Sequence, residues 1–345
     1  MRLPFANVRA LELTGFDGPS SLRLADRPLR EPGPGEVRVR FHASALNHLD
    51  VFVTRGLPKR PLPAILGADG AGIVDAIGEG VTRARVGAEV ILDPVVSCGA
   101  CDWCGRQEEV HCERFGIIGE HLDGTFQEAL VVPEGNLYPR PRHLSWPEAG
   151  ALPLSFLTAW RLLFTRGRLV AGDALVVVGI GGGVALAALL LGKARGLRVF
   201  VTSRDVAKRD RAKALGADDA FSSESFAKEV RAATGGAGAR AVVDTVGPAT
   251  FDESFRALAR EGMVLSVGST SAPKVELSMP RLFFRHLSLV TSTMGTSREF
   301  ASMLADVERA KIRPVVDMTF PLARGADAFA RLEAGEQFGK VVLEI

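Results

Sequence analysis

The stretch LVVVGIGGGVA, residues 175–185, decides the fold of this chain. Its first four residues predict a buried strand, its glycines a tight turn, and the apolar residues after them a helix. Gly179, Gly182 and Ala185 fit a G-x-x-G-x-x-[GA] variant rather than a regular G-x-G-x-x-G motif. Such a turn allows a pyrophosphate close to the backbone, where N–H groups at the helix start bind its charge. We predict a dinucleotide site here, at Gly179, Gly181, Gly182, Gly183 and Val184. The alternative is a glycine-rich turn without a ligand.

The residues around this turn predict an α/β domain at 151–290. Short apolar runs alternate with helical stretches, which is typical of a doubly wound parallel sheet covered on both faces. The expected strands are 175–178, 198–202, 241–244, 264–267 and 287–290, with helices at 205–215 and ending near 260.

The two ends of the chain predict a second, mainly β domain. Residues 1–150 hold short strand-like runs bounded by glycine or proline, for example 36–41, 72–77 and 89–92. The tail, 291–345, predicts a helix at 298–311 and strands at 315–320 and 340–343. We expect this tail to fold back on the first block.

Composition excludes several classes of protein. The chain has 345 residues, with 42 Lys and Arg against 40 Asp and Glu, so its net charge of +2 gives no electrostatic basis for binding nucleic acid. Its length suggests about two domains. No secretory signal is visible, and we expect a cytoplasmic protein. Residues 174–192 carry no charge, but the glycines at their centre favour a buried strand, turn and helix over a membrane span.

The residues at the end of the second expected strand, 198–202, indicate whether the site prefers NAD or NADP(H). Sites that prefer NAD usually place an acidic residue there, to bind the ribose hydroxyls. Ser203 and Arg204 stand at this point, with Lys208 following, and both charge and hydroxyl favour the 2′-phosphate of NADP(H). The acidic Asp205 argues against a preference for NADP(H). The alternative is that these basic residues only form a solvated face of the following helix.

The four cysteines of the chain are clustered within a short segment. Their spacing, C-x-x-C-x-x-C-x7-C, places four thiols on a lobe at about 95–115: Cys98, Cys101, Cys104 and Cys112. In a chain without a signal sequence such a cluster predicts a metal site rather than disulfides. Four sulfur ligands favour one structural Zn²⁺ with no open position, with an iron–sulfur cluster as the competitor.

Taken together, these motifs resemble the medium-chain dehydrogenase/reductase superfamily, which includes zinc alcohol dehydrogenases and quinone oxidoreductases. The resemblance covers essentially the whole chain. It is carried by the cysteine lobe, the glycine turn and the segments EPGPGEV (31–37), LGADGAG (66–72), ALGAD (214–218) and FGKVV (338–342). It implies a GroES-like substrate domain, a Rossmann domain and a homodimer or homotetramer.

The chain departs from the zinc alcohol dehydrogenases at the catalytic metal. The resemblance aligns Asn47, Ala68 and Leu154 with the three ligand positions, and Asp69 with the glutamate of the Gly-His-Glu motif. Asn, Ala and Leu do not form a zinc site, so we expect no catalytic metal. The Asn47-x-x-Asp50 pattern instead resembles zinc-independent quinone and enone reductases.

The resemblance also suggests roles for individual residues. Asn47, His48, Asp50 and Thr158 are expected near the nicotinamide. Asn47 would donate to the substrate carbonyl, and His48 would contact the pyrophosphate or donate a proton. Asp50 is a catalytic candidate, and the alternative is that it only orients the loop. Val267, Ser269 and Lys340 are further cofactor candidates, although Lys340 also fits a plain surface lysine.

These observations predict an NADPH-dependent oxidoreductase that reduces a conjugated enone or quinone without catalytic zinc. Two alternatives stay open: an alcohol or aldehyde oxidoreductase, and an NADPH-binding protein without turnover. The substrate would be a small molecule.

Overall fold

A computed structural model describes residues 7–268 and 270–345. The chain divides into two compact units. The first runs to Leu154 and adds Thr296–Leu304 and Arg313–Ile345, and the second holds Ser155–Gly295 and Ala305–Ile312. The boundaries expected at 150 and 291 lie close to this division, except that 305–312 fall in the second unit.

The first unit is mainly β. Its strands are β1 (Asn7–Leu13), β2 (Leu22–Pro28), β3 (Glu36–Ala45), β4 (Ala64–Ile65), β5 (Ala71–Ile77), β6 (Glu89–Leu92), β7 (Val95–Val96), β8 (Gly116–Ile117), β9 (Ala129–Pro133), β10 (Leu137–Pro139), β17 (Val316–Pro321) and β18 (Lys340–Glu344). Its helices are α1 (His48–Thr54), α2 (Asp102–Gly105), α3 (Trp146–Gly150) and α11 (Gly325–Glu333).

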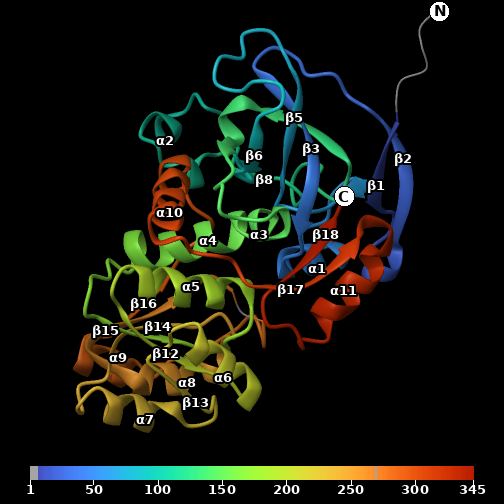
Figure 1. The fold of residues 1–345 in the computed structure, drawn as a ribbon. Coiled ribbons are helices and arrows are strands. Elements are labelled where there is room, and N and C mark those ends of the chain that lie inside the picture. The colour runs from blue at the N-terminus through green and yellow to red at the C-terminus, as the bar shows by residue number, and fades with distance from the viewer. Residues whose placement is uncertain (1–6, 269) are drawn as a thin grey trace, which may run out of the picture. The chain divides into compact units, whose positions relative to one another are not determined.

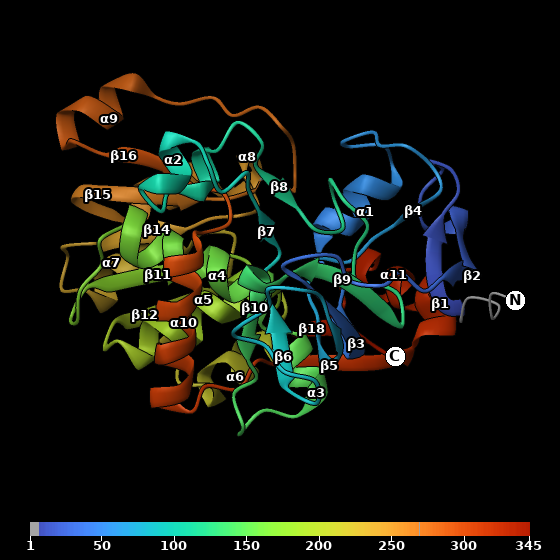
Figure 2. The same ribbon diagram turned by 90° about the horizontal axis from the view of Figure 1, so that it is seen from above.

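The largest sheet of this unit joins both ends of the chain. Its order is β10-β6-β5-β3-β18-β17, with β9 also paired to β3. The tail strand β18 lies antiparallel to β3, and β17 lies parallel to β18. A smaller sheet, β2-β1-β4, packs its apolar residues with those of α11 in one core, as the blue strands and the red helix in Figure 2 show. The tail therefore completes the first unit, as expected.

The second unit is a parallel sheet with helices on both faces (Figure 1). Its strands are β11 (Ala174–Val177), β12 (Arg198–Thr202), β13 (Asp219–Phe221), β14 (Ala239–Val243), β15 (Leu258–Ser266) and β16 (Ser288–Thr291). Its helices are α5 (Gly183–Ala194), α6 (Val206–Ala214), α7 (Phe226–Ala233), α8 (Pro248–Ala257) and α9 (Met279–Arg285). The division between the units falls within α4 (Pro153–Trp160) and α10 (Ser297–Ala310).

The order of this sheet, β13-β12-β11-β14-β15-β16, is the doubly wound order of a Rossmann domain. Apolar residues of α7 and α8 pack on one face against β11, β12, β14 and β15. The strand order reverses direction at β11, so the glycine turn lies at the switch point where such sheets bind ligands. The predicted fold class is confirmed.

The parallel sheet differs from expectation at two places: the strand expected at 264–267 already begins at Leu258, and β13 was not expected. The helix expected to end near residue 260 ends at Ala257, because β15 begins at Leu258 and its backbone pairs with β14. Residues 174–192 form β11 and most of α5. None of the described helices is both long and apolar enough to span a bilayer.

Candidate active site and metal centre

Asn47 and Asp50 are positioned by the passage from β3 into α1. Asn47 is the N-cap of α1, and its backbone N–H donates to Asp50 Oδ2 at 2.7 Å. The other oxygen, Asp50 Oδ1, accepts from Gly67 N at 3.1 Å. The buried Asp50 carboxylate therefore ties the start of the helix to the loop before β5, which agrees with an orienting role.

That loop carries Asp69, which is fully buried. The loop packs so closely that a Cβ at Gly67 would lie 2.5 Å from a ring carbon of Phe126, and Gly67 has a φ of +99°. Only glycine fits this position without displacing its neighbours. The backbone oxygen of Asp69 accepts from the hydroxyls of Ser44 and Thr125, at 2.7 and 2.5 Å. Asp69 is thus fixed through its backbone as well as its side chain.

Lys340 reaches the same place from the other end of the chain. β18 pairs with β3 with Val342 opposite Ala45, and Leu46 N donates to Val341 O at 2.9 Å. Continuing this register by two residues places Lys340 opposite Asn47. Lys340 is 5% exposed, so it is not the surface lysine that its sequence position also allowed.

Asn47, Asp69 and Lys340 form one buried network. Lys340 Nζ donates to Asp69 Oδ2 at 2.8 Å and to Asn47 Oδ1 at 2.5 Å. Asn47 Nδ2 donates to Asp69 Oδ2 at 3.0 Å. The second oxygen, Asp69 Oδ1, accepts from the backbone N–H of Leu154 at 2.6 Å. Three of the four positions aligned with the alcohol dehydrogenase zinc site, Asn47, Asp69 and Leu154, therefore meet at the Asp69 carboxylate.

Burial first, and then the charge of Lys340, shifts the pKa values of two residues beside this network. Burial raises the pKa of Asp50 to about 7, against the opposing effects of its two N–H donors and the charge of Lys340. The pKa of His48 is lowered, first by desolvation and then by the charge of Lys340. His48, the first residue of α1, is therefore mainly uncharged at neutral pH, although the residue as a whole is exposed.

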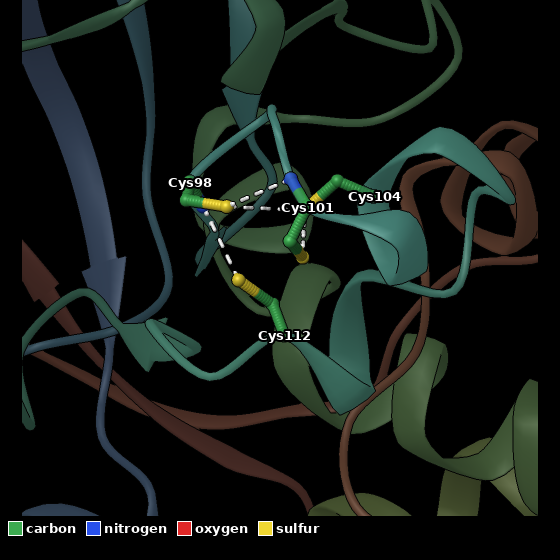
Figure 3. Close-up of side chains that lie close together, drawn as sticks. All are labelled: Cys98, Cys101, Cys104 and Cys112. Carbon is green, nitrogen blue, oxygen red and sulfur yellow. Dashed lines mark hydrogen bonds between the residues drawn. The ribbon is translucent and has the colours of Figure 1, made fainter.

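The four cysteines converge as predicted. Their sulfur atoms all lie within 4.8 Å of one another, and Figure 3 shows the side chains turned toward a common centre. Backbone N–H groups of Ala100 and Cys101 donate to Cys98 Sγ at 3.4 and 3.3 Å, and these bonds lower the pKa of Cys98 to about 6. Four sulfurs at this separation fit a tetrahedral Zn²⁺. Within the described residues, no other group of three or more potential metal ligands lies so close together.

The glycine turn has the geometry that a pyrophosphate needs. Gly179 and Gly181 have φ values of +73° and +134°, which a residue with a side chain rarely adopts. A Cβ at Gly182, the N-cap of α5, would meet no protein atom within 4 Å. The N–H groups of Gly183 and Val184 follow at the helix start. The open space and the helix start together fit a bound dinucleotide.

The end of β12 places the residues expected to select the nucleotide. Asp205 caps α6, with its Oδ1 accepting from Ala207 N at 2.8 Å and from Lys208 N at 3.3 Å. The hydroxyl of Ser203 accepts from Asp205 N at 3.1 Å. Arg204 is exposed, and its guanidinium makes no hydrogen bond to the described residues.

The remaining candidates lie apart from the Asp69 network in sequence. Thr158 is buried on α4 and donates to Met294 Sδ at 3.7 Å. Val267 directly follows β15, at the carboxyl edge of the parallel sheet. Ser269 lies outside the described residues.

Sequence reasoning placed Lys340 near the cofactor phosphates but did not pair it with Asn47 and Asp69. The lysine and the asparagine are 293 positions apart, and only the register of β18 on β3 brings them together. The segment FGKVV drew attention to Lys340, but no pattern in the sequence near it indicates that Asn47 and Asp69 are its partners.

Comparisons with known proteins agree with this architecture. Residues 33–142 match the alcohol dehydrogenase GroES-like domain, and residues 183–309 match the zinc-binding dehydrogenase family. A crystal structure of an NAD-dependent alcohol dehydrogenase superimposes with a TM-score of 0.95, at 44% identity, covering 98% of this chain and 99% of the other.

Three curated relatives carry different activities in their names. A zinc-type alcohol dehydrogenase-like protein of Schizosaccharomyces pombe is 31% identical, covering 97% of both chains. A quinone oxidoreductase of Pseudomonas aeruginosa is 30% identical, covering 97% of this chain and 99% of its own. An acryloyl-coenzyme A reductase of Metallosphaera sedula is 30% identical, covering 92% and 95%.

A GroES-like unit and a Rossmann unit that carries a dinucleotide turn define an oxidoreductase that uses a nicotinamide nucleotide. The chain belongs to the medium-chain dehydrogenase/reductase superfamily. The comparisons and the cysteine cluster support a nicotinamide cofactor and zinc.

Proposed function

We propose that this chain reduces a carbonyl-conjugated alkene or a quinone with NADPH, without a catalytic zinc ion. The observation that carries this proposal is the Asp69 carboxylate, whose oxygens bind Lys340, Asn47 and the N–H of Leu154. An ammonium group and a dication would compete for the same carboxylate. Asn47, Ala68 and Leu154 offer no sulfur, imidazole or carboxylate to hold the metal instead.

The names of two relatives support the substrate class. Acryloyl-coenzyme A is a thioester conjugated to a carbon–carbon double bond, and a quinone contains the same arrangement in a ring. When bound, the reduced nicotinamide supplies a hydride. Both substrates take that hydride at an electrophilic carbon and place the resulting charge on a carbonyl oxygen. The protein has to orient the substrate, exclude water and stabilise that oxygen.

The preference for NADPH rests on the residues after β12. Asp205, the one acidic residue there, is engaged as the N-cap of α6. Arg204 is exposed and can pair with a 2′-phosphate, and Ser203 adds a hydroxyl. The similar crystal structure that is named NAD-dependent makes NADH the necessary comparison.

The alternative within the same enzyme class is an alcohol or aldehyde oxidoreductase. The names of the similar crystal structure and of the Schizosaccharomyces pombe relative favour it. A third possibility is a protein that binds NADPH without turnover.

The test is oxidation of NADPH and NADH, followed by absorbance, with a panel of enones, enoyl thioesters, quinones and simple aldehydes. We expect turnover with the conjugated acceptors and with NADPH. Turnover with aldehydes alone, or two zinc ions per purified chain, would favour the alcohol dehydrogenase. Tight NADPH binding with no turnover on any acceptor would favour the binding protein.

A further inference from the structure

The ammonium group of Lys340 holds a hydrogen-bond donor that the protein does not use. A protonated lysine has three N–H donors. Two of them reach Asp69 Oδ2 and Asn47 Oδ1, and the described residues provide no acceptor for the third. The side chain keeps 6% of its surface exposed, so its two partners hold it in a nearly buried position.

We propose that Lys340 is a catalytic residue whose third N–H binds the substrate carbonyl oxygen. This proposal rests on the proposed function for its substrate class. The positive charge, held by a buried carboxylate and a buried amide, is oriented before the substrate arrives. Such preorganised donors stabilise charge that develops during a reaction.

The neighbouring polar groups are less suited to this role. Both donors of Asn47 Nδ2 already face acceptors, Asp69 Oδ2 at 3.0 Å and Ala45 O at 3.5 Å. The contacts therefore make Asn47 a positioning residue for Lys340 rather than the donor to substrate. The Asp69 carboxylate has no hydrogen-bond donor to offer a carbonyl oxygen. Desolvation lowers the pKa of His48, which disfavours its charged form, and among the described residues no hydrogen bond fixes its ring.

The chemistry balances without a proton from Lys340. The hydride forms a new C–H bond at the β-carbon, and the π electrons of the double bond move to make an enolate. The negative charge on the enolate oxygen accepts the hydrogen bond from Lys340 Nζ. A proton from water then forms the C–H bond at the α-carbon, so one hydride and one proton are consumed. For a quinone, the enolate oxygen takes the proton, and the ring carbon that received the hydride then loses its proton to water while the second carbonyl oxygen gains one, which gives the hydroquinone.

The first test is the binding of 4-nitrophenolate, an aromatic oxyanion, in the presence of NADP⁺, followed by its absorbance change. Lys340→Met would remove the ammonium partner of the buried Asp69 carboxylate, so the variant is also made with Asp69→Asn. We expect phenolate affinity to fall at least about tenfold in Lys340→Met/Asp69→Asn relative to Asp69→Asn alone. The matched control is Lys228→Met, an exposed lysine on α7, which we expect to bind like the wild type. Equal affinity in the double variant and in Asp69→Asn would overturn the proposal.

Turnover gives the second readout. We expect kcat to fall by roughly 100- to 1000-fold in Lys340→Met, as for loss of an oxyanion donor, with partial recovery in Lys340→Arg. The dissociation constant of NADPH should stay within about twofold of wild type. A large rise in that constant with kcat retained would instead assign Lys340 to the cofactor phosphates.

The two readouts separate this proposal from the proposed function. In one outcome, the wild type reduces no conjugated acceptor, but removing Lys340 weakens phenolate binding. The proposed substrate class is then wrong, and the oxyanion site at Lys340 stands. In the other outcome, the wild type reduces conjugated acceptors, but removing Lys340 leaves the phenolate affinity unchanged. The proposed function then stands, and a group other than Lys340 stabilises the substrate oxygen.

Discussion

At the scale of single residues, Arg204 is the sharpest test of nucleotide preference. Its guanidinium is exposed and uncommitted among the described residues, so a bound 2′-phosphate is the charge it can pair with. We expect Arg204→Ala to raise the dissociation constant of NADPH by roughly tenfold or more, because a charged hydrogen bond is lost. Fluorescence titration of both nucleotides checks this, with NADH as the internal control and Arg298→Ala as a matched surface variant. An unchanged NADPH constant would remove Arg204 from the 2′-phosphate site.

Asp50 makes a different prediction, on stability against pH. Its pKa is raised from 3.8 to about 7 by burial, so the folded state favours the neutral acid. The stability that this group contributes is complete below its unfolded pKa and is lost as pH rises through the folded value. The loss occurs between about pH 4 and about pH 7, at no more than about 1.4 kcal/mol per pH unit.

Asp50→Asn removes this titration but retains one acceptor oxygen for the helix start. We expect its free energy of unfolding to increase relative to that of wild type as pH rises across that window, because only wild type loses the stabilisation from the protonated Asp50. Urea unfolding at several pH values measures the difference between the two free energies of unfolding. The buried Asp93 also has a raised pKa, but its contribution is the same in both proteins and drops out of the difference. The exposed Asp26→Asn serves as control. A difference that does not vary with pH would contradict the shifted pKa of Asp50.

At the scale of elements, the cysteine lobe should behave as a separable structural piece. Its four sulfurs lie in the first unit, whereas the glycine turn lies in the second. We expect wild type to hold about one zinc ion per chain and Cys104→Ser to lose most of it, because a structural site needs four ligands. Metal analysis of purified protein measures this, with Ser302→Ala as control. Nucleotide binding should survive, since the second unit keeps its own core. Full zinc content in Cys104→Ser would mean that the cysteines are not the ligands.

The same scale shows what sequence can and cannot supply. Five of the six strands of the parallel sheet were predictable because each contains a short apolar run beside a helix, and 198–202 matches β12 without error. The sixth strand, β13, was missed because it has only three residues and begins with a charged one. The helix end near 260 was missed, since α8 passes into β15 without a glycine or proline between them. Lys340 was recognised but not its partners. Its place depends on the register of β18 against β3, which is set by packing between the two ends of the chain.

At the scale of the whole molecule, the edge of the parallel sheet predicts self-association. β16 is the last strand of its sheet, and among the described strands it pairs with β15 alone. Leu289 on this strand is 38% exposed, and Phe283 and Phe284 on the preceding α9 are 55% and 71% exposed. An open strand edge beside exposed aromatic residues is a ready surface for pairing with another chain. We therefore propose that β16 pairs with the same strand of a second copy.

Light scattering coupled to size-exclusion chromatography tests this assembly. We expect wild type at twice the chain mass of 36.8 kDa or at a multiple of that dimer. Leu289→Lys should shift the protein toward the monomer, because two such lysines would face each other across the strand pair. Val86→Lys, at a residue 60% exposed in the first unit, adds the same charge away from that edge and should leave the mass unchanged. A Leu289→Lys variant that keeps the wild-type mass would place the subunit contact elsewhere, and a monomeric wild type would exclude the assembly altogether.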